Sequence, residues 1–208
     1  TYGESKTFSE ATAKITPDYR AQAAANSITP AAAKDVTAAG FMEDSHSFSA
    51  LMNKKGLFAY NQATGVNFTV TMRSNDGTGS GWATRDFTDV SKLNTAEASK
   101  IAIDKALQSR NAKAIEPGKY TVILEPAACS DLLQNMMFSM NARQADEGRS
   151  FLAKKGGGTK LGEKIVDERV NIYTDPFNTA VPASPWTNDG QARKKMDILK
   201  SGVVANMF

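Results

Sequence analysis

The chain has 208 residues, a length that suits one domain of ordinary size or two small ones. Its composition, 41% hydrophobic and 23% charged, is that of a soluble globular protein, and the net charge of +3 comes from scattered Lys and Arg that do not demand a nucleic-acid partner. No apolar run approaches the ~20 residues of a membrane span, and the single cysteine, Cys129, excludes an internal disulfide framework and favours a reducing, cytoplasmic compartment.

Residues 1–42 are predicted to form a helical lead-in. Thr16-Pro17 has the form of a helix start, with threonine as N-cap and proline in the first turn, and the alanine-rich run Arg20–Asn26 continues it. Thr29-Pro30 repeats this signal, and Gly40 is a suitable C-terminal cap. Two short helices are therefore expected in this region.

Residues 47–87 change to a period of two, which is typical of β-strands. The strictest alternation puts four large apolar residues on one face of a strand: Val66, Phe68, Val70 and Met72. Turns are expected at Asn53–Gly56 and at Asn75–Gly77. The pattern predicts an antiparallel meander with one buried face.

A helix, a strand and a second helix are predicted next. Asn94–Glu97 has the form of a capping box for a helix that reaches about Arg110. The apolar run Tyr120–Leu124 predicts a buried strand, and Pro126 lies in the first turn of a helix that continues to about Met140.

The remaining chain is predicted to complete an α+β fold. Three consecutive glycines make residues 153–161 an expected flexible loop. A strand over Ile165–Tyr173 and a closing hairpin of Met196–Leu199 with Val203–Ala205 follow it. Residues 43–208 are thus expected to form one core, an antiparallel β-meander and twisted sheet with flanking helices.

Several stretches, in their order and spacing from about Gly79 onward, resemble the TldD/PmbA family, also called modulators of DNA gyrase. They are Gly79–Trp82 with Arg85–Phe87, Glu116–Pro126, Gly148–Phe151 with Leu161–Ile165, Asn188–Gly190 and Leu199–Val203. The resemblance implies a TldD/PmbA-like fold, in which residues 1–42 are the tail of an N-terminal domain and residues 43–208 resemble the family's central region.

The resemblance also implies which chemistry this chain lacks. The TldD-like member of such pairs is a zinc metallopeptidase with an H-E-x-x-x-H motif on the helix after the apolar strand, whereas the PmbA-like member lacks this motif. The corresponding positions here are Gln134, Asn135 and Ser139, candidate vestigial positions that carry poor zinc donors and no general base. Zinc is therefore expected only in a TldD-like partner, and no catalytic residue is assigned to this chain. Arg149 and Ser150 are candidate structural or peptide contacts.

Other candidate residues have simpler interpretations. His46, the only histidine, has no Glu, His or Cys at ligand spacing and is expected to be an ordinary loop or strand residue. Cys129 is interpreted as a buried small residue. The methionines of the central helix are expected to pack in the core, with an adaptable peptide-binding groove as the alternative.

These observations favour a non-catalytic PmbA/TldE-like subunit or fragment that partners a TldD-like zinc metallopeptidase in peptide maturation or degradation, or that self-associates. A peptide substrate fits this function, whereas a membrane or nucleic-acid partner is not expected. Two alternatives stay open: an independent hydrolase with unidentified catalytic groups, and a gyrase or nucleic-acid accessory protein whose binding would weaken steeply with salt.

Overall fold

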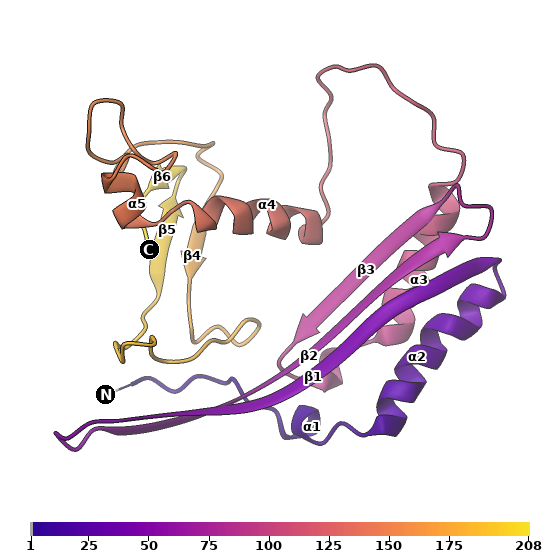
Figure 1. Cartoon of the computed structure of the whole chain (residues 1–208), viewed down its shortest axis with the longest axis horizontal. Helices are drawn as coiled ribbons and strands as arrows, with labels where there is room; N and C mark the ends of the chain where they lie inside the picture. The colour runs from indigo at the N-terminus through magenta and orange to yellow at the C-terminus, as the bar shows by residue number, and fades with distance from the viewer. Residues whose placement is uncertain (1) are drawn as a thin grey trace. The chain divides into compact units, whose positions relative to one another are not determined.

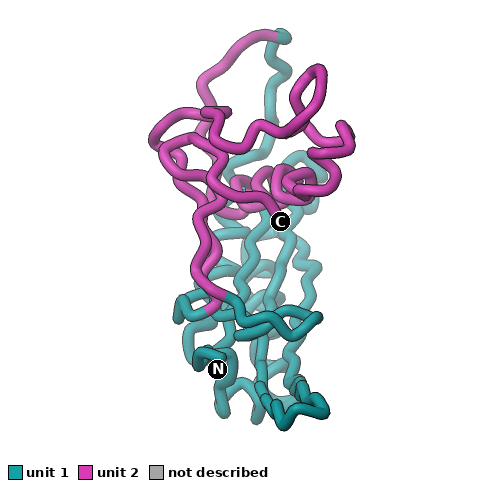
Figure 2. The backbone as a smooth tube through the Cα atoms, turned by 90° about the vertical axis from the view of Figure 1, so that its left-hand side faces the viewer, with its two compact units in different colours: residues 1–117, 177–193 teal, residues 118–176, 194–208 magenta. Residues whose placement is uncertain are grey.

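The computed structural model describes residues 2–208, which divide into two compact units. Unit 1 contains the chain up to residue 117 and residues 177–193, and unit 2 contains residues 118–176 and 194–208 (Figure 2). The chain therefore passes from one unit to the other after residues 117, 176 and 193. The boundary expected after residue 42 falls inside a strand of unit 1.

Unit 1 is built on a three-stranded antiparallel sheet in the order β1-β2-β3. Strand β1 (Val36–Met52) pairs along its whole length with β2 (Phe58–Ser74), and β2 pairs with β3 (Ser80–Phe87). The predicted meander is confirmed, although its strands are longer than expected. The prediction that helical structure extends to residue 42 is wrong, because the residues from Val36 onward pair with β2 and join the sheet.

Helices α2 (Pro17–Ala32) and α3 (Thr95–Gln108) cover one face of this sheet (Figure 1). The four alternating residues of β2 point into this layer and are between 0% and 3% exposed: Val66, Phe68, Val70 and Met72. The predicted cap of α3 is confirmed, because the Asn94 side chain accepts a hydrogen bond from the Glu97 N–H at 3.0 Å. A short helix α1 (Glu10–Ala13) and a 3-10 turn η1 (Val90–Lys92) complete the helical elements of unit 1.

Helix α2 is one continuous helix, so the prediction of two short helices is wrong. Thr16 is its N-cap and Pro17 its first residue, as expected. Pro30 lies in the last turn, where the missing proline N–H removes only one hydrogen bond of the helix. The Ala33 N–H still donates to the Thr29 carbonyl at 3.3 Å, and the helix ends a few residues before β1.

Residues 177–193 belong to unit 1 through contacts with its N-terminal segment. The Tyr2 hydroxyl donates to the Gly190 carbonyl at 2.6 Å, and the Tyr2 ring lies 5.1 Å from the Trp186 ring, centroid to centroid. This segment therefore folds with the sheet of unit 1 although it comes from the far end of the sequence.

Unit 2 combines helices α4 (Pro126–Phe138) and α5 (Ala142–Asp146) with a small sheet of β4 (Ile172–Thr174), β5 (Met196–Lys200) and β6 (Val203–Val204). Its core consists of six buried residues: Met140, Ala145, Leu152, Ile198, Leu199 and Val204. The predicted closing hairpin is confirmed by the pairing of Leu199 with Val204.

Of two strands predicted in unit 2, the first does not form and the second is shorter than expected. Residues 120–124 form no strand in the structure and are exposed, with Ile123 at 97%. The strand predicted over Ile165–Tyr173 is reduced to β4. High β-propensity alone does not make a strand, because a strand also needs a neighbour that accepts and donates its backbone hydrogen bonds.

The glycine-rich segment of unit 2 forms a tight hairpin. Gly156, Gly157 and Gly158 have φ of 96°, 111° and 80°, values that favour glycine. The Lys154 N–H donates to the Gly158 carbonyl at 2.9 Å and closes the turn. No helix within residues 2–208 has the length and apolar character needed to cross a membrane.

Candidate functional site

Helix α4 carries two of the three positions that the resemblance aligns with a zinc motif, and both side chains are exposed. The Gln134 amide donates to the Ser130 hydroxyl at 3.4 Å, one turn earlier on the helix. The Asn135 amide donates to the Asp131 carbonyl at 2.9 Å, again within α4. Both amides therefore bond to their own helix rather than converging on a common point.

Ser139 is the C-cap of α4, and the structure links it to Ser150. The Ser150 hydroxyl donates to the Ser139 carbonyl and accepts a hydrogen bond from the Leu152 N–H, the latter at 3.1 Å. Five residues turn a regular helix by about 500°, so side chains at 134 and 139 point about 140° apart. The backbone at this helix end is thus organised around Ser150.

These residues do not fit a zinc ion. Zinc in proteins is bound by imidazole, thiolate or carboxylate groups, whereas the three positions supply two neutral amides and a hydroxyl. Among residues 2–208, no group of three or more His, Cys, Asp or Glu side chains is arranged to hold a metal ion. No chemical step through zinc can be derived from this chain.

Arg149 is held by a neighbouring carboxylate. Its guanidinium forms an ion pair with Glu147, which also pairs with Arg143 at 2.8 Å. The hydrogen bond from Arg149 holds the pKa of the Glu147 carboxyl below its ordinary value, with that from Arg143 as the second cause. Arg149 and Ser150 thus stabilise the turn after α5, while contact with a peptide stays a prediction.

The remaining candidates are His46, Cys129 and the methionines around the end of α4. His46 is an exposed residue of β1 whose Nε2 lies 3.3 Å from the Gln62 side-chain oxygen and whose ring packs near Phe8, in agreement with its interpretation as an ordinary strand residue. Cys129 is partly exposed, whereas the sequence predicts a buried position. Of the methionines, Met140 is fully buried and Met136 packs against the core of unit 2.

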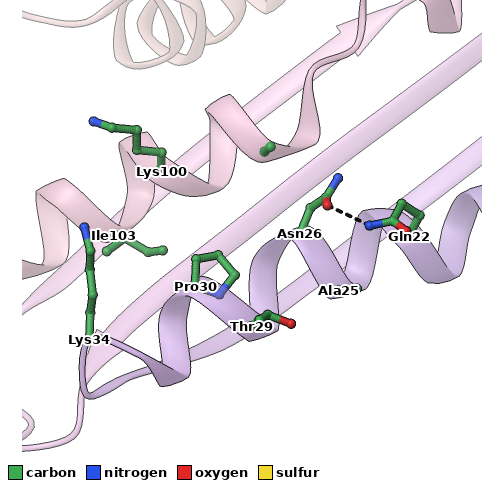
Figure 3. Close-up of a pocket in the computed structure, with 9 residues that line it drawn as sticks. Gln22, Ala25, Asn26, Thr29, Pro30, Lys34, Lys100 and Ile103 are labelled. Atoms are coloured by element: carbon green, nitrogen blue, oxygen red, sulfur yellow. Dashed lines mark hydrogen bonds between the residues drawn. The ribbon is translucent and has the colours of Figure 1, made fainter.

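A depression of about 500 Å³ between α2 and α3 is the feature that the sequence did not indicate (Figure 3). Lys34 and Lys100 lie on its rim, and both form ion pairs with Asp104, at 3.9 and 2.6 Å. The hydrogen bond from Lys100 lowers the pKa of Asp104, and the same bond raises the pKa of Lys100. The hydrogen bond between Lys100 and Asp104 favours the charged form of both groups, so neither is prepared to exchange a proton with a substrate. Because the lysines are scattered through the sequence, no local pattern predicts that Lys34 and Lys100 lie beside Asp104.

Two family models match the chain and together cover nearly all of it. Residues 7–110 match the PmbA/TldA metallopeptidase central domain, and residues 117–208 match the PmbA/TldA metallopeptidase C-terminal domain. The two matches meet near residue 117, where the structure divides into its units. No curated protein gives a sequence match.

Solved structures share the fold over the entire chain. A putative modulator of a DNA gyrase from Thermotoga maritima has a TM-score of 0.90 at 22% identity, and one from Bacteroides thetaiotaomicron has 0.84 at 21%. TldE from Thermococcus kodakarensis has a TM-score of 0.82 at 18% identity. Each match covers 100% of this chain but only 49%, 48% and 47% of the respective solved chains, so the sequence spans about half their length.

Proposed function

This chain belongs to the PmbA/TldD metallopeptidase family, and we propose that it is a non-catalytic, PmbA/TldE-like member that acts together with a TldD-like zinc metallopeptidase. In this role it would shape the space through which a peptide reaches the partner's zinc and would hold that site in position. The proposed process is maturation or degradation of peptides.

The observation that carries this proposal is the donor set at the end of α4. Gln134, Asn135 and Ser139 offer oxygen and nitrogen atoms that remain neutral near pH 7, so they neither neutralise Zn²⁺ nor accept the proton of a zinc-bound water. A peptidase that needs a zinc-activated water must then take it from another chain.

The likeness to TldE supports the assignment at the level of fold. Because the chain spans about half of that protein, the remainder of a full-length relative is free to contribute contacts to the partner. In the proposed complex this chain supplies a folded surface, and the zinc-binding helix belongs to the partner.

Co-elution with a TldD-like peptidase tests the proposal. The purified chain is mixed with the peptidase and run on a size-exclusion column, and peptide cleavage is measured for each protein alone and for the mixture. We expect a shared peak, cleavage that chelation abolishes, and no cleavage by this chain alone. Separate elution combined with unchanged cleavage by the peptidase would contradict the proposal.

The same samples distinguish the two alternative functions. An independent hydrolase would cleave peptides without the partner and would continue to do so after chelation. A nucleic-acid accessory protein would bind DNA with an affinity that falls steeply as salt is raised. Either result would favour the corresponding alternative over the proposed function.

A further inference from the structure

Helix α2 and strand β1 enclose a pocket within unit 1, on the helix-covered side of the sheet. Its volume is about 160 Å³, and its floor is formed by Phe68 and Val70, two buried core residues of β2. Figure 1 shows α2 running alongside β1. The α2 residues that line the pocket include Ala24 and Ile28, whereas other residues of α2 line the depression toward α3. The pocket therefore lies on the side of α2 that faces away from α3.

The pocket exists because small residues face each other across this gap. Ala24 and Ser27 line it from α2, and Ala38 and Gly40 line it from β1. A Cβ at Gly40 would lie 2.8 Å from the Thr69 carbonyl oxygen, so the backbone of β1 is too close to β2 for a side chain at this position. The helix and the strand thus leave a gap of side-chain size.

The pocket presents apolar surface to a ligand. The Ser27 hydroxyl is already bonded, since it lies 2.8 Å from the Ser99 hydroxyl and 3.3 Å from the Ala23 carbonyl oxygen. The Arg20 guanidinium donates two hydrogen bonds to the Asp44 carboxylate, at 2.7 and 2.9 Å. Sites for drug-sized molecules have volumes of about 300–1,000 Å³. A pocket of 160 Å³ therefore suits one large apolar side chain rather than a whole small molecule.

Strand β1 supplies a row of backbone groups next to this pocket. It lies at the edge of its sheet, and β2 is its only partner strand within residues 2–208. The outward N–H and C=O groups of an edge strand can pair with another strand, and proteins commonly prevent this with lysine, proline or a β-bulge. Residues 36–43 contain no lysine, arginine or proline and pair with β2 in one unbroken register. This part of the edge is therefore open to the addition of a strand.

We propose that an extended peptide adds to the edge of β1 as an antiparallel strand and places a large apolar side chain in the pocket. Residues that lie directly opposite each other in antiparallel strands share a face, so the anchoring residue lies opposite Gly40. Main-chain hydrogen bonds supply affinity in this mode of recognition, and the pocket selects the side chain.

Charge defines a second requirement for the peptide. Glu43 lies three residues after Gly40, on the face of the sheet that the helices do not cover. It shares a cross-strand row with Asn67 and Asp86, so this row carries two acidic residues and no basic one. A lysine or arginine opposite Glu43 complements this charge. In an antiparallel strand the basic residue comes three positions before the apolar anchor.

Fluorescence anisotropy with the full 208-residue chain tests this motif. The probe is a fluorescein-labelled peptide of serine and threonine that carries one lysine and, three residues later, one leucine. We expect saturable binding that weakens roughly tenfold when the leucine is replaced by serine and about two- to fivefold when the lysine is replaced by glutamate. Equal binding of the three peptides, or no binding of any, would overturn the proposal.

Substitutions in the chain locate the site. Ala24→Phe adds a ring to the α2 wall of the pocket and should weaken binding of the probe roughly tenfold. Ala25→Phe is the matched control, because Ala25 is exposed on the side of α2 that faces α3. Circular dichroism confirms that both variants fold. Equal losses from the two substitutions would contradict the proposal.

A charge exchange tests the predicted register. Glu43→Lys should weaken binding of the lysine peptide and strengthen binding of the glutamate peptide, each by about two- to fivefold. Asp86→Lys, two strands away from the added peptide, should change the ratio of the two affinities less. A ratio that responds equally to the two substitutions would overturn the pairing with Glu43.

Hydrogen exchange measures the strand pairing itself. A strand added to β1 protects its outward N–H groups, so a saturating concentration of the probe should slow amide exchange in residues 36–43. Residues 80–87, which form the strand β3, should exchange as in the free chain. Unchanged exchange in residues 36–43 at saturation, or equal slowing in β3, would overturn the proposal.

This inference does not rest on the proposed function. Co-elution with a peptidase and the absence of cleavage by the chain alone can stand while the probe fails to bind. Conversely, binding of the probe that Ala24→Phe weakens stands even if the chain proves to have its own activity.

Discussion

Ser150 is the residue that determines how the end of helix α4 meets the following turn. Its half-buried hydroxyl donates to the Ser139 carbonyl and accepts from the Leu152 N–H. Leu152 is itself fully buried in unit 2. The role that we assign to Ser150 is therefore to position the backbone between α4 and the core.

Replacing Ser150 should destabilise unit 2. Ser150→Ala removes two hydrogen bonds and leaves the Ser139 carbonyl without this donor, which should lower the free energy of unfolding by about 1–3 kcal/mol. Urea unfolding measures this loss. Ser130→Ala, at an exposed position of α4, should change stability by less than about 0.5 kcal/mol. Equal effects of the two substitutions would contradict the role of Ser150.

Asp76 gives unit 1 a specific pH dependence. The Ser74 hydroxyl, 2.5 Å away, is the largest cause that lowers the pKa of the Asp76 carboxyl from 3.8 to about 2, and the Thr78 N–H adds to it. A lowered pKa stabilises the folded state above the unfolded value, and this stabilisation is lost as pH falls from about 4 to about 2.

Asp76→Asn should therefore flatten the acid side of the stability profile. Between pH 5 and pH 2 the wild-type melting temperature should fall by more than that of the variant, because only the wild type takes up a proton at this turn on unfolding. Glu168→Gln, at an exposed carboxylate of unit 2, is the control. Parallel profiles for wild type and Asp76→Asn would exclude the assignment.

At the scale of elements, Gly81 near the start of β3 reflects the close packing of α3. A Cβ at Gly81 would lie 2.0 Å from the Ala102 carbonyl oxygen and 2.6 Å from the Ala106 nitrogen. Gly81 is buried, and both opposing atoms belong to the helix backbone, which cannot move aside like a side chain. The glycine thus sets the distance between α3 and the sheet.

Gly81→Ala should push α3 away from β3. We expect a loss of about 1–3 kcal/mol from overpacking, seen as a lower melting temperature by calorimetry. Gly65→Ala is the matched control in β2, because its nearest neighbour is the Ser45 hydroxyl at 3.2 Å, the end of a side chain that can rotate. Similar melting temperatures for the two variants would show that α3 is not packed as described.

Local sequence patterns are sufficient to predict some elements of this fold but not others. The alternation of Val66 to Met72 and the Asn94 cap are local signals, and the structure confirms both. The run Tyr120–Leu124 has equally strong β-propensity but forms no strand, because pairing depends on a neighbour that propensity cannot supply. Thr29-Pro30 has the form of a helix start but lies in the last turn of α2, where a proline is tolerated.

The same distinction applies to the candidate site. That Gln134 and Ser139 are poor zinc donors follows from residue type alone. The structure adds that the Gln134 amide donates within α4 and that the Ser139 backbone carbonyl accepts from the Ser150 hydroxyl. The Lys34–Asp104–Lys100 cluster joins helices that lie far apart in sequence, so no local pattern could reveal it.

At the scale of the whole molecule, the two units are joined by chain segments of different character. Residues 111–125 contain no helix or strand, and every one of them is exposed. Both family models end or begin within or next to this stretch, at residues 110 and 117. The stretch is therefore a connection between two folded parts and contributes to neither core.

Limited proteolysis should cut this connection first. Trypsin needs an extended segment, so its earliest cleavage should follow Lys113 or Lys119, ahead of Lys54 in the tight turn between β1 and β2. A time course followed by mass spectrometry identifies the order of cuts. Early cleavage after Lys54 would contradict this assignment of the connection.

The zinc content of the purified chain tests the central claim most directly. After equilibration with zinc and removal of unbound metal, the account predicts far less than a stoichiometric amount, and no change in that amount when Gln134 or Ser139 is replaced by Ala. A stoichiometric zinc ion that either substitution removes, together with peptide cleavage that depends on this metal, would contradict the account.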